Sequence, residues 1–224
     1  MKSDDVATRR AAARALGRIG PAAKTAAPLL DLATADKDPG VRQEAALAHW
    51  RVTGQRNRLI VLIQLLPDPP PAVRDAGCQA LAAMQADAAE AVDVIALLLG
   101  EKELRLRAVM TLGAIGAPAR KIEPALRKLL EDRDSEVQLR AAFALWQITG
   151  DAKTSLKVIN ETLATEEQYT QSIVLLGEMG QAARPLLQTL VNLYRFEDVP
   201  ADRLALAEAI QKIDPALAKK LGIR

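Results

Sequence analysis

The sequence predicts an all-α fold, a right-handed α-solenoid of about six to seven stacked helical hairpins. Two observations support this prediction. A segment that starts with an anchor residue, usually Arg, and runs through small residues to Leu-Gly recurs every 31 to 34 residues. Hydrophobic residues make up 50% of the chain but aromatic ones only 3%, so Ala, Leu, Val and Ile must fill a helix-rich core. The anchors are Arg9, Arg42, Arg74, Arg105, Gln138, Tyr169 and Arg203.

The period divides the chain into six repeats and a C-terminal cap. The repeats cover approximately 4–35, 37–67, 69–100, 101–132, 134–165 and 167–198, and capping helices are expected in 200–224. Because each repeat packs only against its neighbours, all 224 residues can form a single elongated domain. The first repeat starts at once, without a polar capping helix. We therefore expect either that a longer chain precedes this segment or that the open end near Val6 pairs with another molecule.

Each repeat is expected to contain two helices. In the first repeat they lie at 6–19, where Gly20-Pro21 ends the helix, and at about 26–35. Three second helices carry a proline near their start, where a missing N–H does no harm: Pro28, Pro124 and Pro185. An acid stands four residues before four of the anchors: Asp5, Asp38, Glu101 and Asp134. These carboxylates are expected to cap the following helix and to lie near the anchor side chain.

The second and fifth repeats depart from the pattern in the same way. Trp50 and Trp146 replace the glycine of the other copies, and the final glycine moves to Gly54 and Gly150. This pairing predicts an alternative hairpin subtype whose wider gap is filled by indole. His49 stands where other copies have Leu or Ile, so we interpret it as a core residue.

The small-residue strings resemble a known repeat family. Ala12-Ala13-Arg14-Ala15-Leu16-Gly17-Arg18-Ile19-Gly20 and Leu112-Gly113-Ala114-Ile115-Gly116 are similar to HEAT repeats, and more narrowly to the short bacterial kind also found in phycobilisome lyases. The resemblance extends over nearly all of the chain and implies a solenoid. Most members of the family are scaffolds and adaptors, and a few are enzymes, so the resemblance is specific for architecture and weak for function.

Charge and cysteine content exclude several classes of protein. The 30 basic and 28 acidic residues give a net charge of +2, which is too small to indicate a nucleic-acid or membrane partner. The single cysteine, Cys78, excludes an intramolecular disulfide and fits a reducing compartment. The chain has no long apolar run, and Asp4 and Asp5 stand where a signal peptide would be apolar. We expect a soluble, cytoplasmic protein without membrane insertion.

Helical geometry predicts a first candidate binding surface. The residues one, five and nine positions after an anchor lie opposite the core of the first helix and are expected to face solvent on the convex side. In the fourth to sixth repeats, this set forms an apolar strip that includes Leu106, Met110, Leu139, Phe143 and Val174. Contiguous exposed apolar surface is typical of an interface. The alternative is a register or twist that buries these side chains.

A second candidate surface lies on the second helices, which are expected to line the concave side. Its solvent-facing residues are polar and of mixed charge: Gln64, Arg127, Lys128, Glu131, Asn160, Glu161, Gln188 and Asn192. Such a surface favours a protein or peptide partner. A groove for duplex nucleic acid would need many more Lys and Arg residues, so nucleic acid is not the expected partner.

No residue is predicted to be catalytic, cofactor-binding or metal-binding. The chain lacks a phosphate-binding loop and a Cys/His pair, and its one histidine excludes HEAT-type hydroxylases that bind two irons through His-Glu pairs. We expect a protein–protein interaction scaffold or adaptor without catalysis, with self-association as the alternative to a foreign partner. Two other functions remain open: a bilin lyase or isomerase, as the resemblance allows, and nucleic-acid binding through Arg9, Arg10, Arg14 and Arg18.

Overall fold

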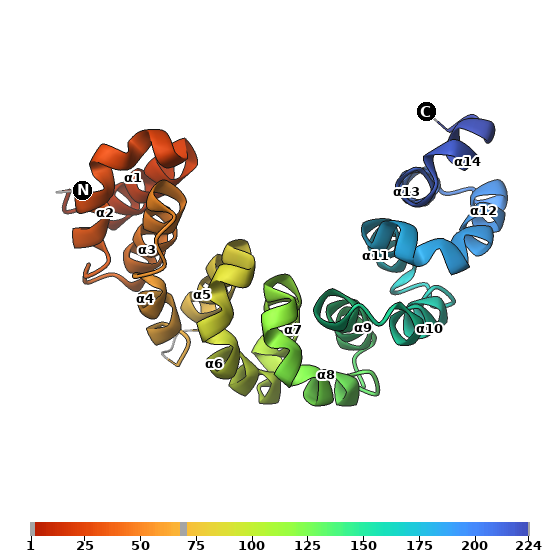
Figure 1. Cartoon of the computed structure of the whole chain (residues 1–224), viewed down its shortest axis with the longest axis horizontal. Helices are drawn as coiled ribbons and strands as arrows, with labels where there is room; N and C mark the ends of the chain where they lie inside the picture. Colours follow the sequence, from red (N-terminus) through yellow and green to blue (C-terminus); the bar gives the residue numbers. More distant parts are fainter. Residues whose placement is uncertain (1–2, 68–70, 224) are drawn as a thin grey trace. The chain divides into compact units, whose positions relative to one another are not determined.

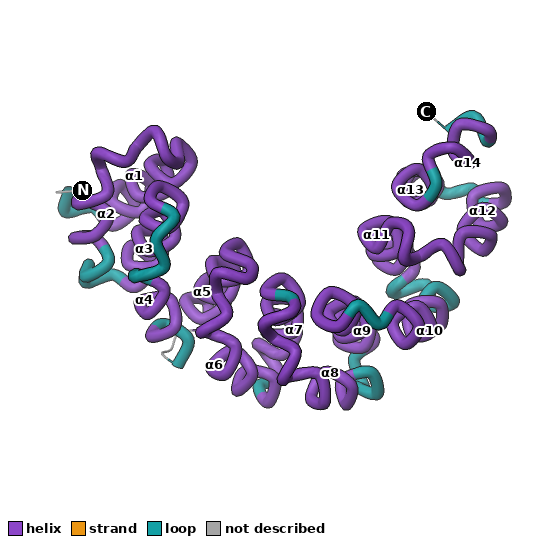
Figure 2. The backbone as a smooth tube through the Cα atoms, viewed as in Figure 1, coloured by secondary structure: helices purple, strands orange, loops and turns teal. Residues whose placement is uncertain are grey.

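The computed structural model describes residues 3–67 and 71–223 and confirms the all-α prediction. Helical hairpins follow one another along the chain, and none of the described segments is a strand (Figure 1, Figure 2). The chain divides into two compact units, Met1–Lys121 and Ile122–Arg224. We call them unit 1 and unit 2. That the whole chain acts as one domain stays a prediction.

Each predicted repeat range contains one pair of α-helices. Unit 1 contains α1 (Val6–Ile19), α2 (Ala27–Ala33), α3 (Pro39–Thr53), α4 (Leu59–Gln64), α5 (Pro71–Met84), α6 (Val92–Leu97) and α7 (Lys102–Ile115). Unit 2 contains α8 (Glu123–Leu129), α9 (Ser135–Thr149), α10 (Ala152–Thr162), α11 (Tyr169–Met179), α12 (Leu187–Phe196), α13 (Pro200–Ile213) and α14 (Pro215–Lys220). Short 3₁₀ segments join or extend several of these: η1 (Gly20–Ala26), η2 (Gln85–Ala91), η3 (Leu98–Gly100), η4 (Ala117–Ile122) and η5 (Gly180–Leu186).

The helix boundaries follow the predicted signals closely. The first helix has the predicted bounds, with Asp5 at its start and Gly20 at its end. Pro28 and Pro124 lie in the first turns of α2 and α8. Pro185 differs, because it lies within η5, before the start of α12.

The first helices of successive hairpins form one row and the second helices another. Within unit 1, α1 packs on α3 and α5 on α7, and within unit 2, α11 packs on α13, whereas no two successive second helices pack as extensively among the described residues. In a curved array, the more closely spaced row lies on the inner side. In each unit taken by itself, the second helices therefore lie on the outer side of the curve (Figure 2), and the concave placement of these helices was wrong.

Small residues allow the first helices to cross closely. A Cβ atom on Gly17 of α1 would lie 3.0 Å from Cβ and 3.1 Å from Cα of Ala48 on α3. The same contact recurs in unit 2, where a Cβ on Gly177 of α11 would lie 3.1 Å from Cα of Ala209 on α13. These distances are shorter than ordinary van der Waals contacts, so the crossings depend on glycine.

The two hairpin subtypes predicted from the tryptophan repeats are present. Gly20, Gly116 and Gly180 end their helices at φ of 67°, 74° and 54° with ψ between −141° and −130°, whereas Gly54 and Gly150 adopt left-handed helical geometry with ψ of 3° and 2°. The Trp50 indole N–H donates to the Asp87 carboxylate at 2.9 Å. Trp146 packs on Phe143 with ring centroids 5.4 Å apart. Both indoles pack within the fold, as predicted.

Candidate partner-binding surfaces

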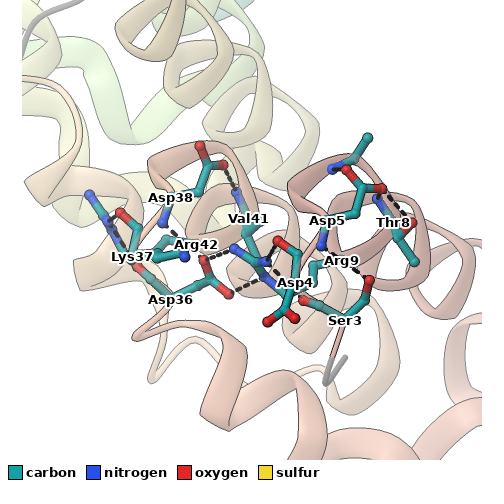
Figure 3. A network of polar contacts seen from close by, with 11 residues as sticks. Ser3, Asp4, Asp5, Thr8, Arg9, Asp36, Lys37, Asp38, Val41 and Arg42 are labelled. Atoms are coloured by element: carbon teal, nitrogen blue, oxygen red, sulfur yellow. Dashed lines mark hydrogen bonds and ion pairs between the residues drawn. The ribbon is translucent and has the colours of Figure 1, made fainter.

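The anchors Arg9, Arg74 and Tyr169 hold their hairpins to the loop that precedes the next one. Nε and Nη2 of Arg9 donate to the Asp36 carboxylate at 2.8 and 2.9 Å (Figure 3). Its Nη1 donates to the backbone carbonyl oxygens of Ser3 and Asp4. Arg42 in turn donates to the Asp36 carbonyl oxygen at 2.9 Å. The acid that binds the Arg9 side chain is therefore Asp36, from the loop before α3, and not Asp5, the acid predicted to lie near it. The network joins neighbouring hairpins and is structural in character.

Three of the four acids that precede the anchors cap the following helix. The carboxylates of Asp5, Asp38 and Asp134 accept backbone N–H groups at the starts of α1, α3 and α9, as predicted. Glu101 does not cap α7 with its side chain, because its carboxylate accepts a hydrogen bond from Arg74. In unit 2, the Tyr169 hydroxyl donates to the Glu197 carboxylate at 2.8 Å.

The paired carboxylates are expected to make the folded state less stable in acid. Hydrogen bonds from Arg9 hold the pKa of Asp36 below the usual value of about 3.9. A lowered native pKa contributes stability that is present above the unfolded pKa and is lost as pH falls through the native pKa. We expect unit 1 to lose stability below about pH 4, and Asp36→Asn to reduce that loss. Urea unfolding at neutral pH and at about pH 3 measures the difference. The control is Glu90→Gln, whose exposed carboxylate has no partner among the described residues. If both variants lose the same stability between neutral pH and about pH 3, the loss does not originate at Asp36.

Each second helix of unit 1 presents at least one apolar side chain to solvent. Leu30, Leu62 and Ile95 are fully buried and define a common register for α2, α4 and α6. Two positions further along, Leu32 and Leu97 are 75% and 74% exposed. Two more apolar residues on these helices, Leu29 and Ile60, are about half exposed, at 51% and 52%. We call these four side chains, Leu29, Leu32, Ile60 and Leu97, the leucine face.

The corresponding helices of unit 2 are polar at the same register. There the buried reference residues are Leu126, Ile159 and Leu190, and the residues two positions further along are exposed and hydrophilic: Lys128, Glu161 and Asn192. The other polar residues predicted for this surface, Gln64, Arg127, Glu131, Asn160 and Gln188, are exposed as well. Arg127 forms ion pairs with Glu123 and Asp151. The Gln188 side chain donates a hydrogen bond to Asn192, so some polar groups of this surface already have partners within the chain.

The prediction of an exposed apolar strip on the first helices was wrong for its two central residues. Leu139 is fully buried and Phe143 is only 8% exposed, and both belong to the core of unit 2 together with residues of α10 and α11. The equivalent positions of α3, Gln43 and Leu47, are buried too. The burial therefore accompanies the tryptophan-containing hairpin subtype. The three remaining residues of the strip are half-buried: Leu106, Met110 and Val174.

The sequence contained a signal for the leucine face that the prediction did not use. Counting two residues on from Leu30, Leu62 and Ile95 selects Leu32, Gln64 and Leu97. The prediction selected only the polar members of this set.

Comparison with known proteins agrees with this arrangement of hairpins. A family model described as HEAT repeats matches residues 1–49 and 94–177, which together exceed half of the chain. The chain belongs to the HEAT-repeat family. Its resemblance to HEAT repeats at the level of sequence is thereby confirmed, and its hairpins can be called HEAT repeats.

Two solved structures show the same fold. One is described as the complex of CpcE and CpcF of phycocyanin lyase from Nostoc sp. PCC7120, and its matching chain is 22% identical over 95% of this HEAT protein and 91% of that chain, with a TM-score of 0.59. The other is an engineered protein, 23% identical over 95% of this chain and 66% of that one, with a TM-score of 0.52. A search of curated proteins found no match.

The one histidine and the one cysteine of the chain are both buried. His49 is 5% exposed and lies 3.9 Å from Asp31, which confirms its place in the core. Cys78 is buried, and burial raises the pKa of its thiol to about 11, so it is a poor nucleophile. Within residues 3–67 and 71–223, no group of three or more His, Cys, Asp or Glu residues is arranged to hold a metal ion. In the same part of the chain, no helix is long and apolar enough to cross a membrane.

Proposed function

We propose that this HEAT-repeat protein is a protein-binding scaffold that contacts its partner through the leucine face of unit 1. The observation that carries the proposal is the repetition of exposed leucine and isoleucine on three successive second helices. Leu32 and Leu97 are each about three-quarters exposed, although a soluble chain gains by burying such side chains. Exposed apolar side chains that gather in one region are typical of interaction sites.

The repeat architecture supports binding in a second way. Neighbouring hairpins fix the second helices through the core and through the hydrogen bonds of the anchors, so the leucine face is ordered before a partner arrives. A pre-ordered surface loses less conformational entropy on association than a flexible one. A partner that covers Leu32 and Leu97 would remove their exposed apolar surface from water.

We propose that the protein acts by binding and carries out no catalysis. The polar pairs of the described chain are engaged in capping and in joining hairpins, and the one cysteine is a buried thiol of high pKa. We further propose a cytoplasmic location, which the single cysteine among 224 residues supports because reduced thiols predominate there.

The double variant Leu32→Glu with Leu97→Glu is expected to abolish partner binding and to leave the fold intact. Both side chains are mostly exposed, so carboxylates there cost little in stability, but they oppose desolvation at an interface. The measurement is affinity capture from the source cells with quantitative mass spectrometry, followed by titration of each purified candidate partner.

The matched control is Val199→Glu with Leu204→Glu, which introduces the same two carboxylates at exposed apolar positions of unit 2. Proteins captured by the wild type and this control but not by the leucine variant are partners of the leucine face. If the three baits capture the same proteins with the same affinity, the leucine face is not the binding surface. Light scattering over a range of concentrations detects self-association; a dimer that the leucine variant dissociates identifies a second copy as the partner.

A further inference from the structure

Unit 1 also carries a cluster of arginines on α1 and α3. The leucine face lies on other helices, α2, α4 and α6. We propose that this cluster, the arginine patch of Arg10, Arg14, Arg18 and Arg51, binds an acidic segment of a protein partner. It is a second site, separate from the leucine face, so the two proposals stand or fall independently.

Helix geometry places three of these arginines together. Arg10, Arg14 and Arg18 follow one another at intervals of four residues on α1, which puts them in a stripe along one side of the helix. Arg14 and Arg18 are exposed and Arg10 is half-buried. The stripe lies beside the buried residues Arg9, Ala13 and Gly17, which face the interior.

The close crossing of α1 and α3 brings in the fourth arginine. A Cβ on Gly17 would lie 3.7 Å from Cδ of Arg51, so the exposed Arg51 side chain lies against α1 at the residue that precedes Arg18. At the other end of the stripe, the guanidinium of Arg10 lies against Gly40, where a Cβ would come within 2.7 Å of its Nε. The glycines thus let two arginines lie directly on the backbone of the neighbouring helix.

Three of the four guanidinium groups have no anion to neutralise them. Among the described residues, Arg10, Arg18 and Arg51 have no side-chain hydrogen bond or ion pair, and Nε of Arg10 is buried without a hydrogen-bond partner. Only Arg14 is paired, through Nε to the Glu44 carboxylate at 3.0 Å. With one acid against four arginines, the patch has a local excess of positive charge that favours an anionic ligand.

The pair between Arg14 and Glu44 indicates which anion fits. It shows that a carboxylate can be held on this side of α1 by an arginine that remains about half exposed. Guanidinium groups bind carboxylates through paired N–H donors in one plane. Aspartate or glutamate side chains of a partner can engage the three unpaired arginines in the same way.

The size of the patch favours an acidic peptide over nucleic acid. On the next first helix, α5, the corresponding positions hold Asp75, Gln79 and Ala83, and Asp75 is already paired with Arg107 of α7. The arginines at these helix positions therefore belong to the first two hairpins and do not continue on α5. A duplex would need phosphate contacts along a longer path, whereas a short acidic segment needs only this region.

Unit 2 provides an internal comparison. Its equivalent crossing has the same tight geometry, with Lys212 of α13 in the place of Arg51 and Cδ of Lys212 at 3.5 Å from a Cβ built on Gly177. The stripe positions on α11, however, are Thr170, Val174 and Glu178. The crossing itself therefore does not require arginines, and their accumulation in unit 1 is a separate feature of this chain.

The test uses fluorescence anisotropy with a labelled peptide of about 12 residues that alternates Glu and Gly, long enough to span two hairpins when extended. The 224-residue chain is expected to bind it at low salt, and more weakly at about 0.2 M salt. The triple variant R10Q, R18Q and R51Q is expected to lower the affinity at least about tenfold. The matched control K212Q, K219Q and K220Q changes the net charge by the same amount in unit 2 and is expected to change affinity less than about twofold.

Three results would overturn the proposal. These are no binding of the peptide by the wild type at low salt, an equal loss of affinity in both triple variants, and tighter binding of a labelled single-stranded oligonucleotide through the same arginines, which would assign the patch to nucleic acid. Circular dichroism checks folding. If the half-buried Arg10 proves necessary for the fold, the double variant R18Q and R51Q of exposed residues is tested in its place, with K219Q and K220Q as its control.

Discussion

Replacing Leu139 with alanine is expected to lower the free energy of unfolding of unit 2 by about 2–5 kcal/mol. Leu139 is fully buried in the core of unit 2. Removing most of its side chain leaves a cavity that rigid neighbouring helices can fill only in part. Urea denaturation followed by circular dichroism measures the loss.

The control for this prediction is Leu204→Ala, the same substitution in the same unit. Leu204 lies on α13 and is 61% exposed, so its truncation is expected to change the free energy of unfolding by less than about 0.5 kcal/mol. Should both variants lose equally little stability, Leu139 would be a surface residue, and the apolar strip predicted from helical geometry would have to be reinstated.

Gly17→Ala is expected to lower the free energy of unfolding of unit 1 by about 1–3 kcal/mol. The new methyl group would lie 3.0 Å from Cβ of Ala48, and the nearest backbone atom, Cα of Ala48, cannot rotate away. Helices α1 and α3 must therefore separate and lose contacts along their length. This cost exceeds the gain in helix propensity from glycine to alanine, which is about 1 kcal/mol at most. Thermal unfolding monitored by circular dichroism measures the net effect.

Gly100→Ala is the matched control within unit 1. Apart from Gly100, its chain neighbours and the backbone of its own helix, no heavy atom of the described chain lies within 4 Å of the place that its Cβ would occupy. We therefore expect this variant to unfold at the wild-type temperature or slightly above it, because alanine restricts the unfolded chain more than glycine does. A Gly17→Ala variant as stable as Gly100→Ala would mean that the crossing can relax, and that glycine there is not required by packing.

The residues that determine the fold were readable in the sequence because their roles are local. Asp5 and Gly20 fix the ends of α1 through a cap and a turn, and both act within a few residues of their own position. The paired displacement of Gly54 and Gly150 likewise predicted a second hairpin subtype, since a left-handed turn ends a helix wherever it occurs.

The candidate surfaces were harder to predict because exposure depends on the neighbouring hairpins. Phe143 occupies a position that a single helix would direct to solvent, yet the helices around α9 bury it. Leu32 and Leu97 follow a buried residue by two positions, which would have placed them outward, but leucines on an amphipathic helix are ordinarily assigned to the core. The arginine stripe was visible in the sequence, whereas the position of Arg51 over Gly17 required the crossing of α1 and α3.

The two tryptophan-containing hairpins give this protein a built-in optical label for each half. The chain has two tryptophans, and Trp50 belongs to unit 1 while Trp146 belongs to unit 2. A single-tryptophan variant, W50F or W146F, therefore emits from one unit alone. The indole of Trp50 donates a hydrogen bond to a carboxylate, whereas that of Trp146 packs on a phenyl ring. The two indoles therefore have different surroundings, and their emission is expected to differ. Following each in denaturant would reveal whether the halves melt together or in sequence.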